Sequence, residues 1–391
     1  MTITAPKGFR AHGVAAGLKS AAGALDVAVV VNDGPDATAA GVFTANRVKA
    51  APVLWSEQVV RGGVVRAVVL NSGGANACTG PLGFQDTHAT AEHTAALVSE
   101  HSPRLLIGAS EVAVCSTGLI GERLPMDKLL SGVRAAVKGL ARDGGAAAAR
   151  AIMTTDTRPK STVVDGGGWR VGGMAKGAGM LAPGLATMLC VLTTDAVAGT
   201  ETLDAALREA TRLTFDRVDS DGCMSTNDTV LLLASGASGI EPTPEELAEA
   251  VTAACRDLCD QLVDDAEGAT KKVAIEVTGA ATDDDAVEVG RSVARNNLVK
   301  TALFGNDPNW GRILAAVGTT AAAFEPDQLD VAVNGVWVCR AGGAAEDRSK
   351  VDLTGRDVTV KVELHAGTAA ATIWTNDLSH GYVHENSAYS T

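Results

Sequence analysis

Short apolar runs, each bounded by Gly, Asn, Asp or Ser, alternate along this chain with longer segments whose apolar residues recur at helical spacing. The clearest runs predict strands at residues 27–31, 64–70, 188–193 and 230–234, and further runs occur at 272–278, 358–364 and 369–374. Helical spacing predicts helices at 125–142, 200–215 and 243–266, the last opening with Thr243, Pro244 and Glu245. The alternation predicts an α/β or α+β fold built from layered sheets and helices.

Length and charge exclude several classes of protein. A chain of 391 residues with 46% hydrophobic residues is long enough for about two or three packed domains. The formal net charge of −13 opposes binding to nucleic acid, whose phosphates attract clustered Lys and Arg. The first residues contain no apolar leader, and no apolar stretch approaches the roughly 20 residues of a membrane span. We therefore expect a cytoplasmic protein with neither nucleic acid nor membrane as a partner.

The cysteines and histidines do not form a convincing chemical motif. Seven cysteines spread through a long chain predict reduced thiols, because secreted disulfide frameworks use an even set in a short chain. Cys255 and Cys259, like His380 and His384, share the i, i+4 spacing of metal ligands. Neither pair has a complete ligand set nearby, and two small apolar side chains on a helix are more typical of a core. Cys190 lies in an apolar run, which predicts a buried thiol with a raised pKa rather than a nucleophile.

The most unusual segment is residues 173–195, where a glycine-rich loop containing Lys176 leads directly into an apolar strand. Thr187 lies at this junction, and breaks rich in Gly or Ala at 143–148 and 166–168 predict a soft domain boundary ahead of it. A threonine hydroxyl needs a neighbouring base to act as a nucleophile, and its own α-amine serves once the preceding peptide bond is cut. Taken alone, a threonine at the start of a strand is more simply a β-propensity choice.

Motifs along nearly the whole chain resemble the ornithine acetyltransferase family. KGAGMLAPGLATML (176–189) resembles its self-processing motif, in which a lysine, a Gly-Met pair and a proline precede Ala-Thr. The other motifs follow in the family's order: NSGGANACTG (71–80), CSTGLIGERLPM (115–126), AIMTTD (151–156), STNDT (225–229), DAEGATK (265–271), LVKTALFGNDPNWGR (298–312) and HENSAYST (384–391).

The resemblance implies a self-cleaving enzyme with Thr187 as its nucleophile. Cleavage between Ala186 and Thr187 would give an α chain of 1–186 and a β chain of 187–391. The two chains would interlock in a layered α/β fold of the N-terminal-nucleophile type, commonly as an α2β2 heterotetramer. The family's oxyanion hole maps onto Thr117 and Gly118, although an isolated CSTG would ordinarily be a simple turn.

The resemblance also implies the reaction and its substrate contacts. Acetyl would move from N2-acetylornithine to glutamate through an acetyl-threonine, with ping-pong kinetics, in arginine biosynthesis, and this reaction needs no cofactor or metal. Acetyl-CoA use stays open because no separate coenzyme motif marks it. The substrate-binding positions of the family map onto Thr154, Lys176, Thr187, Glu267, Asn386 and Thr391. Lys176 is suited to the shared α-carboxylate and Glu267 to the distal amine of ornithine.

Two other functions are compatible with the same motifs. An autoprocessed amidase or aminopeptidase would share the nucleophile but pass the acyl group to water. A non-catalytic binding protein with the same fold would stay uncut and would not be acylated at Thr187.

Overall fold

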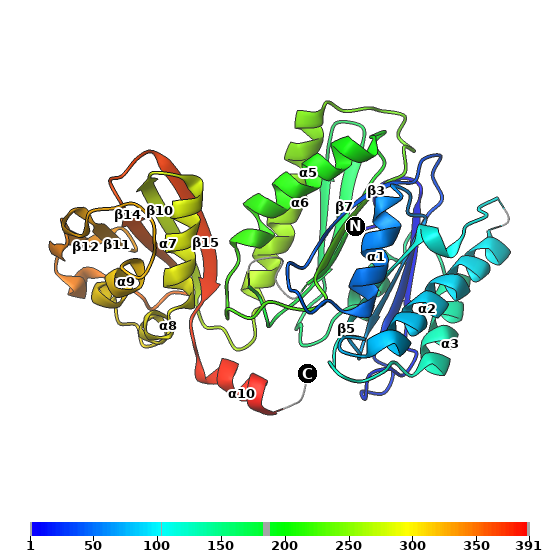
Figure 1. Ribbon diagram of the computed structural model, residues 1–391, viewed down its shortest axis with the longest axis horizontal. Helices are drawn as coiled ribbons and strands as arrows, with labels where there is room; N and C mark the ends of the chain where they lie inside the picture. Colours follow the sequence, from blue (N-terminus) through cyan, green and yellow to red (C-terminus); the bar gives the residue numbers. More distant parts are fainter. Residues whose placement is uncertain (1, 103, 183–187, 389–391) are drawn as a thin grey trace.

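The computed structural model describes residues 2–102, 104–182 and 188–388, which form two lobes (Figure 1). The larger lobe holds two sheets. The first runs β1 (Phe9–Val14), β2 (Val27–Asn32), β4 (Ala67–Ser72), β5 (Val112–Thr117), and the second runs β3 (Thr38–Phe43), β9 (Thr229–Ala234), β8 (Leu189–Thr194), β7 (Arg170–Lys176), β6 (Lys160–Asp165). The two sheets face each other, because Val30 and Leu70 of the first share one buried core with Val191 and Leu231 of the second.

Helices cover the outer faces of both sheets and complete a four-layer sandwich (Figure 1). The first sheet packs against α2 (Gly80–His101) and α3 (Met126–Lys138), and the second against α5 (Thr200–Leu213) and α6 (Pro244–Asp264). Every residue of β2, β4, β5, β8 and β9 is buried, as expected for strands with a core on each face. The short helix α4 (Gly145–Ala151) adds to the core between the sheets.

The helix α1 (Ala51–Arg61) covers the open edge of β5. Its Trp55 Nε1 donates to Val112 O (2.9 Å) and its Ser56 Oγ donates to Val114 O (2.7 Å). These bonds occupy backbone groups that an edge strand would otherwise leave unpaired. The last residues of β5, which reach the site described below, are thereby held in place.

The smaller lobe contains one mixed sheet with three helices against it. Its strands run β13 (Gly343–Ala344), β12 (Val336–Arg340), β11 (Asp330–Val333), β14 (Asp357–Glu363), β10 (Lys272–Ala280), β15 (Ala369–Asn376), and its helices are α7 (Asp283–Arg295), α8 (Asn297–Phe304) and α9 (Trp310–Val317). The lobe contacts the sandwich through β15 and α7, since Asp219 N donates to Trp374 O (2.8 Å) and Arg295 of α7 pairs with Asp219 (2.6 Å).

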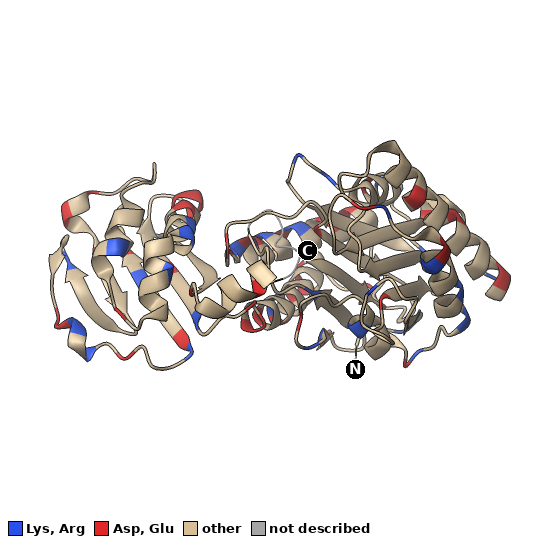
Figure 2. Ribbon diagram, turned by 90° about the horizontal axis from the view of Figure 1, so that it is seen from below, with Lys and Arg blue, Asp and Glu red and all other residues tan. Residues whose placement is uncertain are grey.

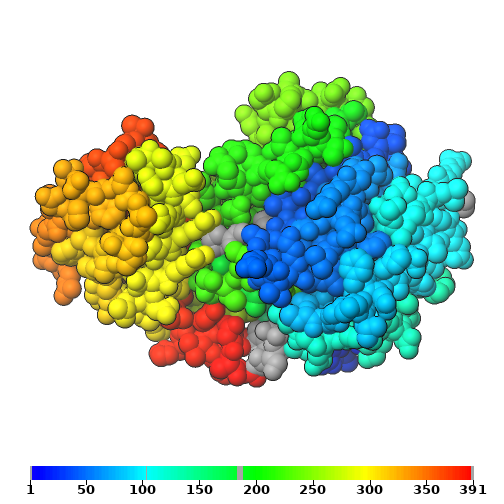
Figure 3. Space-filling view, viewed as in Figure 1, coloured from blue at the N-terminus to red at the C-terminus, as the bar shows by residue number. Residues whose placement is uncertain are grey.

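The final helix, α10 (His380–Ala388), leaves the smaller lobe and returns beneath the junction of the two lobes (Figure 3). Acidic and basic residues are interspersed over both lobes (Figure 2). Among the described helices, none is both long enough and apolar enough to cross a lipid bilayer.

The layered α/β class predicted from sequence is confirmed. Each predicted strand and helix overlaps an observed one, and Thr243 caps α6 in a reciprocal capping box with Glu246. The run at 64–70 starts three residues early, because β4 begins at Ala67. The predicted soft boundary is wrong at residues 166–168, which form the turn of the β6–β7 hairpin within one sheet.

All seven cysteines lie in the described residues and carry free thiols, as predicted. Cys255 and Cys259 lie on the buried face of α6 and pack into the core, whereas His380 and His384 are exposed on α10. Burial in β8 raises the pKa of the Cys190 thiol well above its usual value, as its apolar surroundings predict.

Candidate functional site

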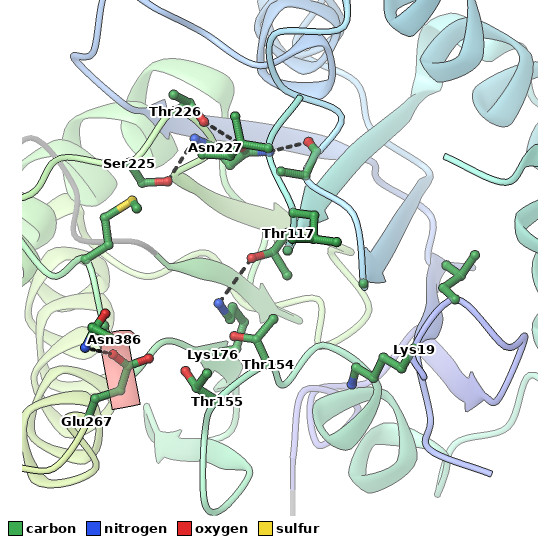
Figure 4. Close-up of a pocket in the computed structure, with 18 of the residues that line it drawn as sticks. Lys19, Thr117, Thr154, Thr155, Lys176, Ser225, Thr226, Asn227, Glu267 and Asn386 are labelled. Atoms are coloured by element: carbon green, nitrogen blue, oxygen red, sulfur yellow. Dashed lines mark hydrogen bonds between the residues drawn. The ribbon is translucent and has the colours of Figure 1, made fainter. Parts of the chain in front are cut away.

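A cavity of about 500 Å³ opens on the sandwich lobe where both of its sheets end and α10 returns (Figure 4). Six residues predicted from sequence line it together: Thr117, Gly118, Thr154, Lys176, Glu267 and Asn386. They come from distant parts of the chain, and the fold brings them together around one cavity. The remaining predicted positions, Ala186, Thr187 and Thr391, lie outside the described residues.

Thr117 and Gly118 form the end of β5 and the turn that follows it. Thr117 O accepts from Gly74 N (3.0 Å), which ties the turn to the loop after β4. Gly118 has φ +124°, and a Cβ at this position would lie 2.6 Å from Gly74 N. Any other residue would therefore combine backbone strain with a clash against backbone. A tightly held glycine beside a hydroxyl is the kind of group pair that an oxyanion hole requires.

Lys176 ends β7 and is buried, with its side chain directed into the cavity (Figure 4). Its Nζ donates to Thr117 Oγ1 (3.2 Å), so the lysine predicted to bind the substrate lies next to the predicted oxyanion turn. Burial lowers the pKa of Lys176, while nearby Asp156 opposes that shift. A buried ammonium that donates to a neutral hydroxyl gains from an anionic ligand.

A buried ion cluster behind the cavity holds this part of the site. Lys160 Nζ lies 2.6 Å from both Asp156 Oδ1 and Asp265 Oδ2, and its side chain is 0% exposed. Asp156 also accepts from Thr154 N (3.0 Å) and Gly177 N (2.7 Å). Burial acts to raise the pKa of Asp156, but Lys176 and Lys160 outweigh it and hold that pKa below its usual value. The cluster thus fixes the loops carrying Thr154 and Lys176 against the loop carrying Glu267.

Asp156 lies in the motif MTTD and Asp265 in the motif DAEG, but the sequence indicates no role for either residue. Lys160 lies outside both motifs. An i, i+4 pair of Asp156 and Lys160 was the available signal, but such pairs are usually solvated charges on a helix. Here the pair spans a loop and the start of β6, so the sequence pattern gave no indication of burial.

The STNDT motif crosses the back of the cavity and links the two sheets. Asn227 Nδ2 donates to Ala75 O (2.7 Å) and to Ser116 O (2.8 Å), both near the oxyanion turn (Figure 4). Asp228 is fully buried, and its Oδ1 accepts from Met188 N (3.0 Å), the residue after Thr187. Burial raises the pKa of Asp228 well above its usual value. The motif itself does not indicate these contacts, which depend on the tertiary fold.

Glu267 and Asn386 face the cavity from the side opposite the oxyanion turn (Figure 4). Asn386 Nδ2 donates to Glu267 Oε2 (2.9 Å), so α10 closes onto the loop between α6 and β10. Glu267 N donates to Ala178 O (2.8 Å), and a Cβ on Gly179 would lie 2.3 Å from Glu267 Oε2. The glycine-rich loop after Lys176 therefore leaves room for the Glu267 carboxylate.

The strands that flank the predicted cleavage point are neighbours. Lys176 at the end of β7 pairs with Leu189 at the start of β8, and β8 pairs in turn with β9. Residues on each side of position 187 therefore belong to one sheet. Among the described residues, no three His, Cys, Asp or Glu side chains converge in the way metal ligands do.

Two facing sheets between helices, with the cavity at their ends, place the chain in the layered α/β class that includes N-terminal-nucleophile folds. The ArgJ family model matches residues 10–391, and the chain belongs to this family. Proteins called arginine biosynthesis bifunctional protein ArgJ are 68% identical in Streptomyces avermitilis and 66% identical in Streptomyces coelicolor, each over 100% of both chains.

A crystal structure of ornithine acetyltransferase complexed with ornithine, from Mycobacterium tuberculosis, is 62% identical to this chain. It covers 48% of this chain and 96% of its own, with a TM-score of 0.45. The family match confirms the resemblance seen in the motifs.

Proposed function

We propose that this chain is a self-cleaving acetyltransferase that moves acetyl from N2-acetylornithine to glutamate in arginine biosynthesis. The observation that carries the proposal is the convergence of six predicted site residues on one cavity, at the ends of strands that flank Thr187. Family membership and the names of the relatives, which refer to arginine biosynthesis, support the proposal.

In the first step the Thr187 hydroxyl attacks the Ala186 carbonyl and shifts the peptide bond to an ester. Water then hydrolyses the ester, which releases the Ala186 carboxylate and leaves a free α-amine on Thr187. The products are an α chain of 1–186 and a β chain of 187–391. They would remain associated because β7 of one and β8 of the other share a sheet.

In the transfer itself the α-amine of Thr187 takes the hydroxyl proton while the oxygen attacks the acetyl carbonyl. The Thr117 hydroxyl and the Gly118 N–H stabilise the oxyanion, ornithine leaves with its amine protonated, and acetyl-threonine remains. The α-amine of glutamate then attacks the acetyl carbonyl of this ester. N-acetylglutamate leaves, and the Thr187 oxygen regains its proton. Lys176 binds the α-carboxylate common to both amino acids, and Glu267, with Asn386 beside it, binds the distal amine of ornithine.

Thr154 and the terminal Thr391 complete the proposed substrate contacts. We further propose a cytoplasmic α2β2 assembly. Acetyl-CoA is an additional donor to the same Thr187 in this proposal, since the relatives are named bifunctional.

The first experiment compares the intact masses of wild type and Thr187→Ala, with N-terminal sequencing of any fragment. We expect two wild-type fragments, the second starting at Thr187, and an uncut variant. A folded wild type that stays uncut would favour the non-catalytic alternative. Partition of the acyl-enzyme between glutamate and water separates the transferase from an amidase: N-acetylglutamate as the main product supports the transferase, whereas free acetate at every glutamate concentration supports the amidase.

A further inference from the structure

A second lysine faces the cavity, and neither the motifs nor the resemblance assigned it a role. Lys19 lies in the loop between β1 and β2 and lines the cavity across from Glu267 and Asn386 (Figure 4). Thr154 and Lys176 lie between the two sides. Among the described lining residues, Lys19, Lys176 and Glu267 are the ones with charged side chains.

The loop that carries Lys19 is anchored by a buried carboxylate. Asp26 is 0% exposed, and it accepts backbone N–H bonds from Ala16 (2.5 Å), Leu18 (2.6 Å) and Lys19 (3.2 Å). These bonds occupy both oxygens of Asp26 and fix the backbone at Lys19. The side chain is therefore presented to the cavity by a rigid support and not by a free loop.

The Lys19 ammonium is only partly satisfied. Its Nζ donates to Leu25 O (2.9 Å), and it makes no ion pair within 4 Å among the described residues. Burial lowers the pKa of Lys19, while Asp26 and Asp156 oppose that shift and Lys176 adds to it. An anionic group bound at each of Lys19 and Lys176 would offset the desolvation of the two cations and their mutual repulsion.

The proposed reaction poses a charge problem that this lysine resolves. Both substrates carry an α-carboxylate, but ornithine ends in an ammonium and glutamate ends in a second carboxylate. A cavity with Glu267 as its partner for the distal group would repel glutamate. Lys176 is already committed to the α-carboxylate, which leaves Lys19 as the described lining cation available for the other carboxylate.

We propose that Lys19 binds the side-chain carboxylate of glutamate when glutamate is the acetyl acceptor, so that opposite walls of one cavity select the two amino acids. This inference rests on the proposed function. It assigns Lys19 to acceptor specificity, with little part in accepting acetyl from N2-acetylornithine. Glutamine, which has the shape of glutamate without its distal charge, is the natural comparison.

The test uses Lys19→Met, Lys19→Arg and a matched control, Lys128→Met. Lys128 is exposed and donates to Gly17 O (3.0 Å) of the same loop, but it does not line the cavity. The two half-reactions are measured separately on the cleaved enzyme: acetylation by N2-acetylornithine, and deacetylation at varied glutamate or glutamine.

For Lys19→Met we expect the glutamate concentration for half-maximal deacetylation to rise about 10- to 100-fold, the usual effect of losing one charge-assisted hydrogen bond. Acetylation should change by less than about 3-fold, and the preference for glutamate over glutamine should largely disappear. Lys19→Arg should retain most of that preference, and Lys128→Met should behave as wild type.

Equal slowing of both half-reactions, or an effect confined to acetyl-CoA as donor, would overturn the inference. Calorimetric titration with glutamate decides it without any acetyl transfer. Wild type should bind glutamate more tightly than Lys19→Met does, and equal affinities would refute the contact. A wild type that binds glutamate but never forms acetyl-threonine would instead refute the proposed function.

Discussion

The Asp228 carboxylate accepts a hydrogen bond from the backbone N–H of Met188 at 3.0 Å, one residue beyond the proposed nucleophile. Asp228 is fully buried just before β9, the strand that pairs with β8. This contact holds the backbone nitrogen of Met188, the atom that follows Thr187 along the chain. Attack on a neighbouring carbonyl depends on such alignment to within a fraction of an ångström.

Removing this acceptor should impair self-cleavage. We expect Asp228→Ala to slow cleavage at least about 10-fold, because the Met188 N–H loses its buried partner and the junction is no longer aligned. Asp228→Asn should cleave at close to the wild-type rate, since its amide oxygen can still accept the bond. The fraction cut is followed on a denaturing gel after a pulse of expression. If Asp228→Asn fails as badly as Asp228→Ala, the charge and not the position is what cleavage needs.

The same residue should make stability depend on pH. A folded-state pKa raised above the unfolded value means that the contribution of Asp228 to stability is complete below about pH 4. That contribution is lost as the pH rises toward the folded pKa. The free energy of unfolding of the protein that keeps Asp228 should therefore fall between pH 4 and pH 8, relative to that of the Asp228→Asn variant.

The protein with Asp228 and the Asp228→Asn variant are both made with Thr187→Ala, so that neither is cut, and are compared by chemical denaturation at several pH values. The two proteins differ in one titrating group, so the contributions of the other carboxyl groups to the pH dependence of unfolding cancel in the comparison. A difference that stays constant over this range would contradict the assignment of a raised pKa to Asp228.

The sequence predicted the layered α/β class and strands such as β2 and β9, because these buried strands are nearly unbroken apolar runs that leave little choice of structure. It missed α2, whose 22 residues include Thr87, Thr90 and Thr94 on the buried face. Thr90 Oγ1 and Thr94 Oγ1 donate to carbonyls four residues back, and these bonds allow polar residues in a core position. Such a helix has weak apolar periodicity.

Six lining residues were found through motifs, whereas the lining residue Lys19 and the supports behind the cavity were not. Thr117 and Lys176 lie in family motifs, but nothing local indicates that their side chains meet. Lys160 and Lys19 were missed because a lysine is read from sequence as a solvated charge unless its partners are known. Those partners, Asp265 and Leu25 O, are set by tertiary structure.

The turn after β5 should not tolerate a side chain. In Gly118→Ala the new methyl group would approach Gly74 N at 2.6 Å, so the backbone must move and the oxyanion donors move with it. We expect self-cleavage and acetyl transfer to fall about 10²- to 10³-fold, as for loss of an oxyanion donor. Product formation is measured by mass spectrometry.

Gly121→Ala is the matched control for that change. Gly121 also has positive φ (+88°), but a Cβ there meets nothing within 4 Å. It should cost about 1 kcal/mol of stability and leave activity near wild type. Equal losses in the two variants would mean that backbone strain in the turn, and not the position of the donors, explains the effect.

The Lys160 cluster should be one of the strongest single contributions to the stability of the site. Lys160→Met leaves Asp156 and Asp265 buried without their shared cation, and removing one partner of such a cluster typically costs about 3 to 5 kcal/mol. The exposed pair of Lys350 and Glu346 provides the control, since Lys350→Met should cost under about 1 kcal/mol. Denaturant titration measures both changes.

A triple variant separates charge from packing. Adding Asp156→Asn and Asp265→Asn to Lys160→Met removes the two uncompensated charges, so part of the lost stability should return. Acetyl transfer should stay low, because Asp156 also accepts from Thr154 N and Gly177 N and an amide matches those contacts less well. If the triple variant is no more stable than Lys160→Met, the cost lies in the packing of the lysine stem, and the cluster stabilises the site by shape and not by charge.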